Sequence, residues 1–178
     1  MLTRFIRNQL IVFAALALAI PAAAIADNTA PPTAQAAAKA ACRTERTAIG
    51  DAAFKLLHGA NGFGKCVSNA VKSAQANDAA ALNTCKKEQS DPAFAAAHGG
   101  KTFAQFYGKN SSGANALGKC VSATSSAADH ADLAATIAAA KSCKTERADR
   151  AAFATHYGTG ANAFGKCVSS KVKTTPTP

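Results

Sequence analysis

The sequence contains few of the large apolar residues from which proteins build a core. Its 178 residues include no Trp, one Met and two Tyr, whereas 47 are Ala. Beyond residue 26, only 21 residues are Val, Ile, Leu, Phe or Tyr. A chain with so little large apolar surface gains little free energy from burial, so we expect a thin core that depends on other sources of stability.

Several functional classes also lack their usual signatures. No G-x-S-x-G, H-E-x-x-H, C-x-x-C or complete P-loop motif is present, which favours a non-enzymatic protein over a secreted enzyme with an unrecognised site. Few aromatic residues lie among the Lys and Arg residues, so stacking on single-stranded nucleic acid is not favoured. We find no alternating strand pattern and expect no cofactor.

The one long apolar run lies near the N-terminus, over residues 10–20, after two arginines. It is about half the ~20 residues that a membrane-spanning helix needs, and it precedes the small-residue cleavage site Ala24-Ile25-Ala26. These features predict a signal peptide over residues 1–26 and export to the cell envelope or the extracellular space. No second such run follows, so we expect no transmembrane segment after cleavage.

What the sequence does contain is a threefold repeat. Each unit begins with C-[KR]-x-E-[RQ], continues through a variable middle and ends with G-A-N-x-[FL]-G-K-C-V-S. The two cysteines of the successive units are Cys42 and Cys66, Cys85 and Cys120, and Cys143 and Cys167. They are separated by 24, 35 and 24 positions, and the extra length of the second unit falls around residues 98–108, which marks a loop.

The repeat predicts an all-α fold, with three disulfide-linked helical hairpin repeats around a thin core. The stretches between the motifs are rich in Ala, Lys, Glu and Leu, which favour helix. We expect a disordered segment over residues 27–35, a three-unit domain over 36–173 (units of about 36–77, 78–126 and 127–173) and a disordered tail over 174–178. Asn77-Asp78 and Ser125-Ser126 can cap new helices, so we expect the linkers between units to bend there.

Six cysteines in an exported chain indicate three disulfides, with a metal site as the alternative. Pairing within units joins the two cysteines of each unit, whereas pairing between units joins Cys66 to Cys85 and Cys120 to Cys143, and leaves Cys42 for Cys167. A single helix from residue 66 to residue 85 would hold those cysteines roughly 28 Å apart, against about 5.5 Å between the Cα atoms of a disulfide. We therefore expect pairing within units, unless a sharp bend at Asn77 brings Cys66 to Cys85.

An Asn and a Lys precede the second cysteine of each unit, and these residues are our repeat-loop candidates: Asn61 and Lys65, Asn115 and Lys119, Asn162 and Lys166. Each Asn stands before an apolar stripe at helical spacing, which predicts a side-chain N-cap and turns the following cysteine toward the core. We expect the glycine before each Lys to permit close backbone approach. Each Lys can pair with the glutamate of its unit, and a surface ion pair worth at most about 1 kcal/mol is favoured over acid-base catalysis.

Three histidines, His58, His98 and His156, each lie near a predicted helix end. They are not in strict register across the units. We therefore expect them to cap helix C-termini rather than to bind a metal, and we assign no metal ligand and no catalytic residue.

The segments N-A-[FL]-G-K-C-V-S, with C-K-x-E-R upstream, resemble those of secreted, alanine-rich bacterial repeat proteins whose activity is uncharacterised. The resemblance covers nearly the whole predicted mature chain, and the third unit fits it best, with Tyr157-Gly158 before the motif. It implies export and repetition and supplies no catalytic residue.

Removal of residues 1–26 would leave 18 basic and 10 acidic side chains, a net charge of +8. Such a charge can attract anionic polymers of the cell envelope. We therefore predict a non-enzymatic extracellular or envelope-associated binding or structural protein that presents similar loops in a row. Its partner would be an anionic cell-envelope polymer or another envelope protein. A secreted enzyme and a basic membrane-active protein are the alternatives.

Overall fold

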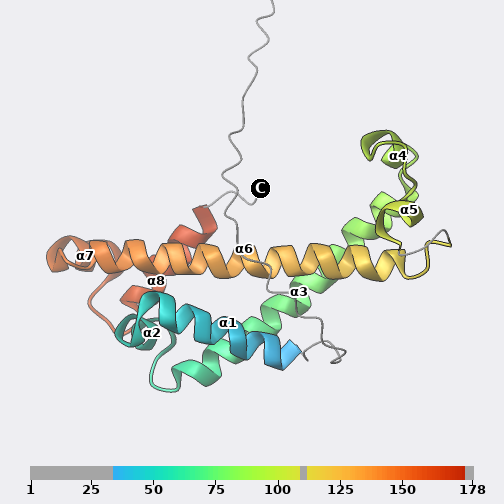
Figure 1. The fold of residues 1–178 in the computed structure, drawn as a ribbon. Coiled ribbons are helices and arrows are strands. Elements are labelled where there is room, and N and C mark those ends of the chain that lie inside the picture. Colours follow the sequence, from blue (N-terminus) through green and yellow to red (C-terminus); the bar gives the residue numbers. More distant parts are fainter. Residues whose placement is uncertain (1–33, 109–111, 175–178) are drawn as a thin grey trace, which may run out of the picture. The chain divides into compact units, whose positions relative to one another are not determined.

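The computed structural model describes residues 34–108 and 112–174, apart from the side chain of Thr174, and this part of the chain consists of helices joined by short loops, with no strand (Figure 1). Its helices are, in chain order, α1 (Ala34–Ile49), α2 (Asp51–His58), α3 (Gly62–Ser90), α4 (Phe94–Ala97), α5 (Phe103–Tyr107), α6 (Ala116–Glu146), α7 (Arg150–Tyr157) and α8 (Ala163–Thr174). The predicted all-α, disulfide-linked fold is confirmed.

The flanking segments are only partly covered by the structure. The predicted signal peptide, 1–26, lies outside the described residues, as do residues 27–33 and 175–178. The helices reach both ends of the described residues, since α1 begins at Ala34 and α8 ends at Thr174. Within the described ranges, no helix is both long enough and apolar enough to cross a bilayer.

The three disulfides join the two cysteines of each unit, as expected. The bonds are Cys42–Cys66, Cys85–Cys120 and Cys143–Cys167, with Cα–Cα distances of 5.9, 5.9 and 6.0 Å. The pairing follows from the length of α3, which runs unbroken through residues 66 and 85 and so keeps those two cysteines apart.

The expected bends between units do not occur. α3 continues through Asn77 and α6 continues through Ser125, so each long helix closes one unit and opens the next. Asn77 caps no new helix, because its side-chain amide donates hydrogen bonds across to α6, to Asp129 at 2.8 Å and to Asp132 at 3.0 Å. Ser125 is buried within α6. The unit boundaries at 77/78 and 126/127 therefore fall inside continuous helices.

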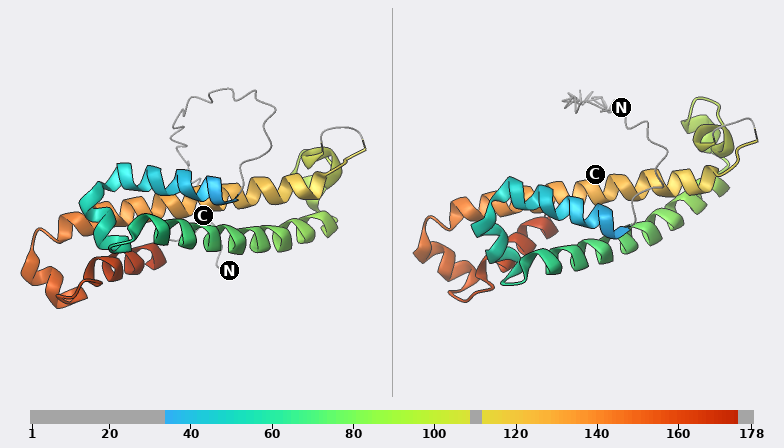
Figure 2. Two further views of the ribbon diagram at one scale, coloured as in Figure 1. Left: turned by 90° about the horizontal axis from the view of Figure 1, so that it is seen from below. Right: turned by 60° about the horizontal axis from the view of Figure 1, so that its bottom comes forward.

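α3 and α6 pack side by side in antiparallel orientation (Figure 2). The C-terminal part of α3 is joined to the start of α6 by Cys85–Cys120, and Ser73, nearer the start of α3, donates a hydrogen bond to Asp132 of α6 at 3.0 Å. The polar contacts of Ser73 and Asn77 with α6 lie between two separate hydrophobic cores. The units are thus connected by shared helices rather than by flexible linkers.

Both cores are thin and rich in cysteine and alanine. The first core gathers units 1 and 3, with both of their disulfides, and its larger members are Ile49, Phe54, Phe153, Phe164 and Val168. The second core belongs to unit 2 and consists of Cys85, Phe94, Phe103, Ala116 and Cys120. Cysteines are the largest side chains that are fully buried in the described residues. The disulfides therefore occupy the places that large apolar residues fill in an ordinary core.

Two glycines of the second unit lie in close contact with α5. A Cβ built on Gly113 would overlap Ala104, and one built on Gly108 would lie 2.6 Å from the Cα atom of Gly113. Gly113 also has a φ of 65°, in the region that residues with side chains rarely adopt. By contrast, a Cβ on Gly64 or Gly118 would meet nothing within 4 Å, so the expectation that the first-turn glycines permit close approach is wrong.

These contacts give a matched pair of predictions. G113A should lower the free energy of unfolding by about 1 to 3 kcal/mol, because it combines overlap with an unfavourable φ. G118A, in the first turn of α6, should be neutral or stabilising by up to about 1 kcal/mol, because alanine favours helix. Urea unfolding of both variants provides the measurement, and equal stabilities would show that the Gly113 contact does not constrain the fold.

Candidate functional site

Each unit directs the glutamate of its C-x-x-E motif toward its own disulfide. The oxygen-to-sulfur distances are 3.4 Å for Glu45 and Cys66, 3.6 Å for Glu88 and Cys120, and 3.8 Å for Glu146 and Cys167. A disulfide sulfur carries no proton, so these are contacts rather than hydrogen bonds. The carboxylate therefore needs a donor from elsewhere in the unit.

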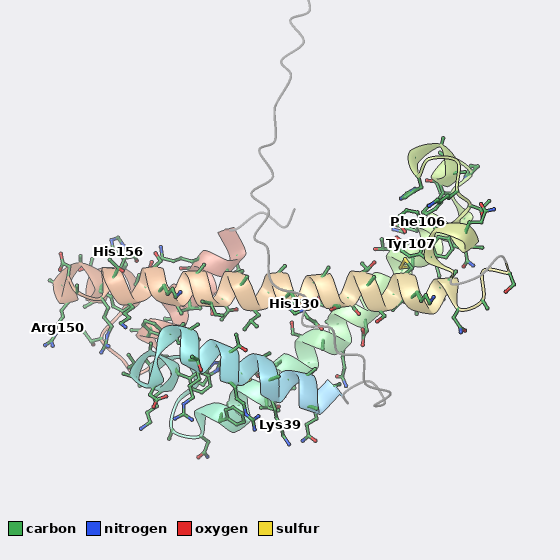
Figure 3. The ribbon with its side chains drawn as sticks, viewed as in Figure 1. Lys39, Phe106, Tyr107, His130, Arg150 and His156 are labelled. Carbon is green, nitrogen blue, oxygen red and sulfur yellow. A yellow bond between two sulfur atoms is a disulfide. The ribbon has the colours of Figure 1, made fainter. Side chains whose placement is uncertain are left out.

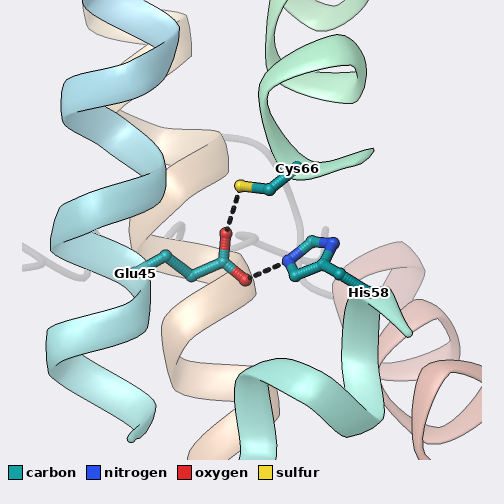
Figure 4. Close-up of side chains that lie close together, drawn as sticks. All are labelled: Glu45, His58 and Cys66. Carbon is teal, nitrogen blue, oxygen red and sulfur yellow. Dashed lines mark hydrogen bonds and ion pairs between the residues drawn. The ribbon is translucent and has the colours of Figure 1, made fainter. Parts of the chain in front are cut away.

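In unit 1 that donor is His58, at the end of α2 (Figure 4). Its Nε2 lies 2.8 Å from one oxygen of Glu45, while the other oxygen faces Cys66. The side chains of Glu45 and His58 are only 6% and 11% exposed. Phe54, one helical turn earlier, packs against the imidazole with ring centroids 4.6 Å apart and so fixes the direction of the ring. α1, α2 and α3 each supply one member of this buried cluster.

In units 2 and 3 a tyrosine takes the place of the histidine. Tyr107 donates to Glu88 at 3.1 Å, and Tyr157 donates to Glu146 at 3.3 Å. Each tyrosine also packs on a phenylalanine four residues earlier, Phe103 or Phe153, with ring centroids 4.9 Å apart. The shared pattern is F-x-x-x-[HY]-G, which places a ring donor opposite the glutamate in every unit.

The second and third sites differ in their electrostatics. Burial, followed by the hydrogen bond to Glu88, raises the pKa of Tyr107, so its phenol stays protonated and donating at neutral pH. In unit 3, the hydrogen bond from Lys171 at 2.6 Å lowers the pKa of Glu146, against the opposing effect of burial. A lowered pKa in the folded state stabilises the fold above the usual carboxylate range, and this contribution is lost as the pH falls through the lowered pKa.

The repeat-loop candidates lie at the starts of three helices. Asn61 and Asn115 immediately precede α3 and α6, but neither side chain caps its helix, so that part of the prediction is wrong. The backbone carbonyls of the three asparagines accept hydrogen bonds at 2.9 to 3.1 Å from backbone N–H groups in the first helical turn. The donors are those of Lys65, Lys119 and Lys166. Asn115 also adopts a left-handed φ of 61°, which asparagine tolerates better than most residues.

These candidates do not form one row. Because α3 and α6 are antiparallel, the starts of α3 and α8 lie beside the first core, whereas the start of α6 lies beside the second. The expected ion pairs between the repeat-loop lysines and the glutamates of their units are not among the ion pairs of the described residues. Glu45 pairs with His58, and Glu146 pairs with Lys171. The cysteine-bearing stripes do face the cores as predicted.

The G-A-N-x-[FL]-G-K-C segments have the glycine and lysine spacing of a P-loop, with cysteine in place of the Ser or Thr. The structure does not give them a P-loop setting. No strand precedes them in the described residues, and the cysteine that replaces the magnesium-binding hydroxyl is held in a disulfide. They act as helix starts.

A surface hollow of about 480 Å³ lies where α1, α2, α6 and α7 meet. Its lining includes the apolar side chains of Ile49 and Phe164 and the cations Lys144, Arg147 and Arg150, which are exposed (Figure 3, where Arg150 is labelled). We call this feature the basic hollow. A neighbouring hollow is lined by Arg43, Arg46, Thr47, Asp51 and Phe63.

The acid that the two hollows share is already paired. Asp51 lies 2.5 Å from Arg46, and the hydrogen bond from that guanidinium lowers the pKa of the carboxyl. Within the described residues, Lys144, Arg147 and Arg150 form no ion pair. The basic hollow therefore presents three cations to solvent, and the acid in its lining, Asp51, is paired with Arg46.

The longer second unit uses its extra residues for an aromatic cluster. His98 stacks on Phe94 with centroids 3.8 Å apart, and Phe106 meets His98 edge-on at 4.6 Å. Phe106 is 45% exposed, and Figure 3 places it on α5 beside Tyr107. His98 also bonds the carbonyl of Phe94 at 2.9 Å at the end of α4, which fits the predicted role at a helix C-terminus.

The fold and the sites together define an all-helical, disulfide-linked protein with a glutamate directed toward each cross-link, buried in unit 1 and partly exposed in units 2 and 3, and with a basic hollow on its surface. No family model, no curated protein and no solved structure matches the chain. We therefore infer the function from the residues of the chain and their contacts.

Proposed function

We propose that the chain is an exported, non-enzymatic binding protein of the cell envelope whose basic hollow binds an anionic polymer. The observation that carries the proposal is the different use of the two signs of charge. Most of the described acidic side chains make hydrogen bonds or ion pairs within the chain, while the cations of the hollow face solvent.

The glutamates show this division most clearly. Glu45, Glu88 and Glu146 are directed toward the disulfides and accept hydrogen bonds from ring donors. Asp129 and Asp132 are exposed, but both accept hydrogen bonds from α3. The lining of the hollow holds three cations against one acid, Asp51, so a repeating anion can meet several cations at once.

The same arrangement supports binding over catalysis. Each of the three glutamates accepts a hydrogen bond from a ring donor in its own unit, and in units 2 and 3 this donor is a tyrosine hydroxyl. The cations of the hollow can hold negative groups without a partner that would transfer a proton. Export is supported by three disulfides, which persist in oxidising compartments.

Charge removal in the hollow tests the proposal. The variant K144Q/R147Q/R150Q should bind purified cell envelope roughly 10- to 30-fold more weakly at low salt, since three exposed contacts of up to about 1 kcal/mol each are lost. The wild-type protein should lose binding as salt rises. Sedimentation with purified envelope provides the measurement.

The matched control is K86Q/K87Q/K101Q, which removes the same charge from exposed positions at the end of α3 and before α5. It should retain most of the binding. An equal loss in both variants would show that net charge alone acts, and no binding by the oxidised wild-type protein at low salt would contradict the proposal. Leakage of dye from anionic vesicles without binding to envelope would favour a membrane-active protein instead.

A further inference from the structure

Unit 1 differs from the other units in the chemistry of its buried cluster. The ligand atoms of Glu45, His58 and Cys66 all lie within 4.8 Å of one another, and Cys42 is bonded to Cys66. Unit 2 brings together Cys85, Glu88 and Cys120, but its ring donor is Tyr107, and unit 3 has Tyr157 at this position. A single exchange of tyrosine for histidine therefore gives unit 1 a nitrogen ligand.

Two cysteine sulfurs, one imidazole nitrogen and one carboxylate oxygen form a set of four donors that suits tetrahedral zinc. In the disulfide form the sulfurs are not thiolates and cannot serve as strong ligands. The remaining donors, Glu45 and His58, are too few for a closed site. Cation binding thus depends on the state of one disulfide.

We propose that unit 1 is a redox-gated site for a zinc-like divalent cation, closed while Cys42 and Cys66 are joined and opened by their reduction. The ligands are the thiolates of Cys42 and Cys66, Nε2 of His58 and a carboxylate oxygen of Glu45. The cysteines are 0% and 4% exposed and Glu45 is 5% exposed, so the site is already shielded from water.

The chemical step is balanced by a thiol reductant. Two thiols give two electrons and two protons to the Cys42–Cys66 bond, which breaks to two cysteine thiols while the reductant becomes a disulfide. The cation then displaces both thiol protons to solvent, and the proton that Nε2 of His58 donates to Glu45 in the oxidised protein moves to Nδ1, so that the lone pair of Nε2 can bind the cation. In the reverse direction, a disulfide oxidant takes two electrons from the two thiolates and two protons from solvent, becomes two thiols, and so restores the Cys42–Cys66 bond and releases the cation.

The geometry favours this exchange of one cross-link for another. His58 of α2 and Cys66 of α3 converge on Glu45 of α1 (Figure 4), and Cys42, also on α1, is bonded to Cys66. His58 is already directed at the cluster by Phe54. A bound cation would tie the same three helices that the disulfide and the Glu45–His58 pair tie in the oxidised protein.

Metal titration of the reduced protein tests the inference. A water-soluble phosphine reduces each disulfide with one water, giving two thiols and the phosphine oxide, and is removed without admitting air. The reduced, metal-free protein is expected to lose most of its helix, so titration with Co²⁺ should restore helix in unit 1 as it gives one equivalent of thiolate-to-cobalt charge-transfer absorption, which Zn²⁺ displaces. The oxidised protein should show no such absorption.

The other units provide the controls. H58Y makes unit 1 resemble units 2 and 3, and should weaken Zn²⁺ binding by at least the roughly 10- to 100-fold that an outer-shell change costs. Y107H should add a second equivalent in unit 2. If reduced H58Y binds Zn²⁺ as tightly as the reduced wild-type protein, or if the reduced wild-type protein shows no cobalt–thiolate absorption, the inference is overturned. Neither result depends on envelope binding, so the proposed function is tested separately.

Discussion

Reduction of all three disulfides in the absence of metal is expected to unfold most of the helical structure at room temperature. The bonds close loops of 24, 35 and 24 residues, and the chain-entropy estimate for loops of this size is about 3.5 kcal/mol each. Together they contribute about 10 kcal/mol, which is comparable with the whole stability of a typical domain.

The composition of the cores makes this loss hard to compensate. The largest fully buried side chains in the described residues are cysteines, and the other buried apolar residues are seven alanines, five phenylalanines, one isoleucine and one valine. Far-UV circular dichroism and thermal melting of the oxidised and reduced proteins, both with chelator, provide the measurement. A reduced protein with the same spectrum and melting temperature as the oxidised protein would show that helix propensity and packing are sufficient.

The second large effect is expected from H58A. This variant leaves the buried carboxylate of Glu45 without its ring donor, and loss of one partner of a buried charged pair typically costs 3 to 5 kcal/mol. We expect a loss near the lower value, about 3 kcal/mol, because water can enter the space that the ring leaves. For a chain of this size, the melting temperature should fall by about 6 to 12 °C.

Two control variants separate the contact from the residue type. H156A removes an exposed histidine of α7 and should change stability by less than about 0.5 kcal/mol. H58Y should lose clearly less than H58A, because a tyrosine makes the equivalent bond to Glu88 and to Glu146 in the other units. If H58A melted at the wild-type temperature, the Glu45–His58 bond could not be a structural contact.

The disulfide pairing could be predicted from the sequence because it follows from helix geometry. A helix that passes through both Cys66 and Cys85 cannot bring them together, and the structure has that helix. The starts of α3, α6 and α8 could also be predicted, because glycine and asparagine precede an apolar stripe at all three positions.

The continuity of the long helices could not be predicted from local signals. Asn77 and Ser125 are good capping residues, but Asn77 bonds to α6 and Ser125 is buried within it. Tertiary contacts of this kind use the same side-chain groups that would otherwise cap a helix. The side-chain caps expected at Asn61 and Asn115 were wrong because neither residue has the extended backbone conformation of a capping residue: Asn61 has φ −92° and ψ 40°, and Asn115 has φ 61° and ψ 17°.

The contacts around Glu45, Glu88 and Glu146 were not predicted from the sequence, for a different reason. The histidines were grouped by residue type, as His58, His98 and His156, whereas the structurally equivalent residues are His58, Tyr107 and Tyr157. The pattern F-x-x-x-[HY]-G was present in all three units and would have aligned them. The basic hollow carried no sequence signal, since it joins residues of α1, α2, α6 and α7 that only the fold brings together.

Each unit is a helical hairpin that is closed by its own disulfide around one glutamate. Peptide mapping of the oxidised protein under non-reducing conditions tests it most directly. We expect the linked pairs Cys42–Cys66, Cys85–Cys120 and Cys143–Cys167. A bridge between Cys66 and Cys85, or between Cys120 and Cys143, would contradict pairing within units.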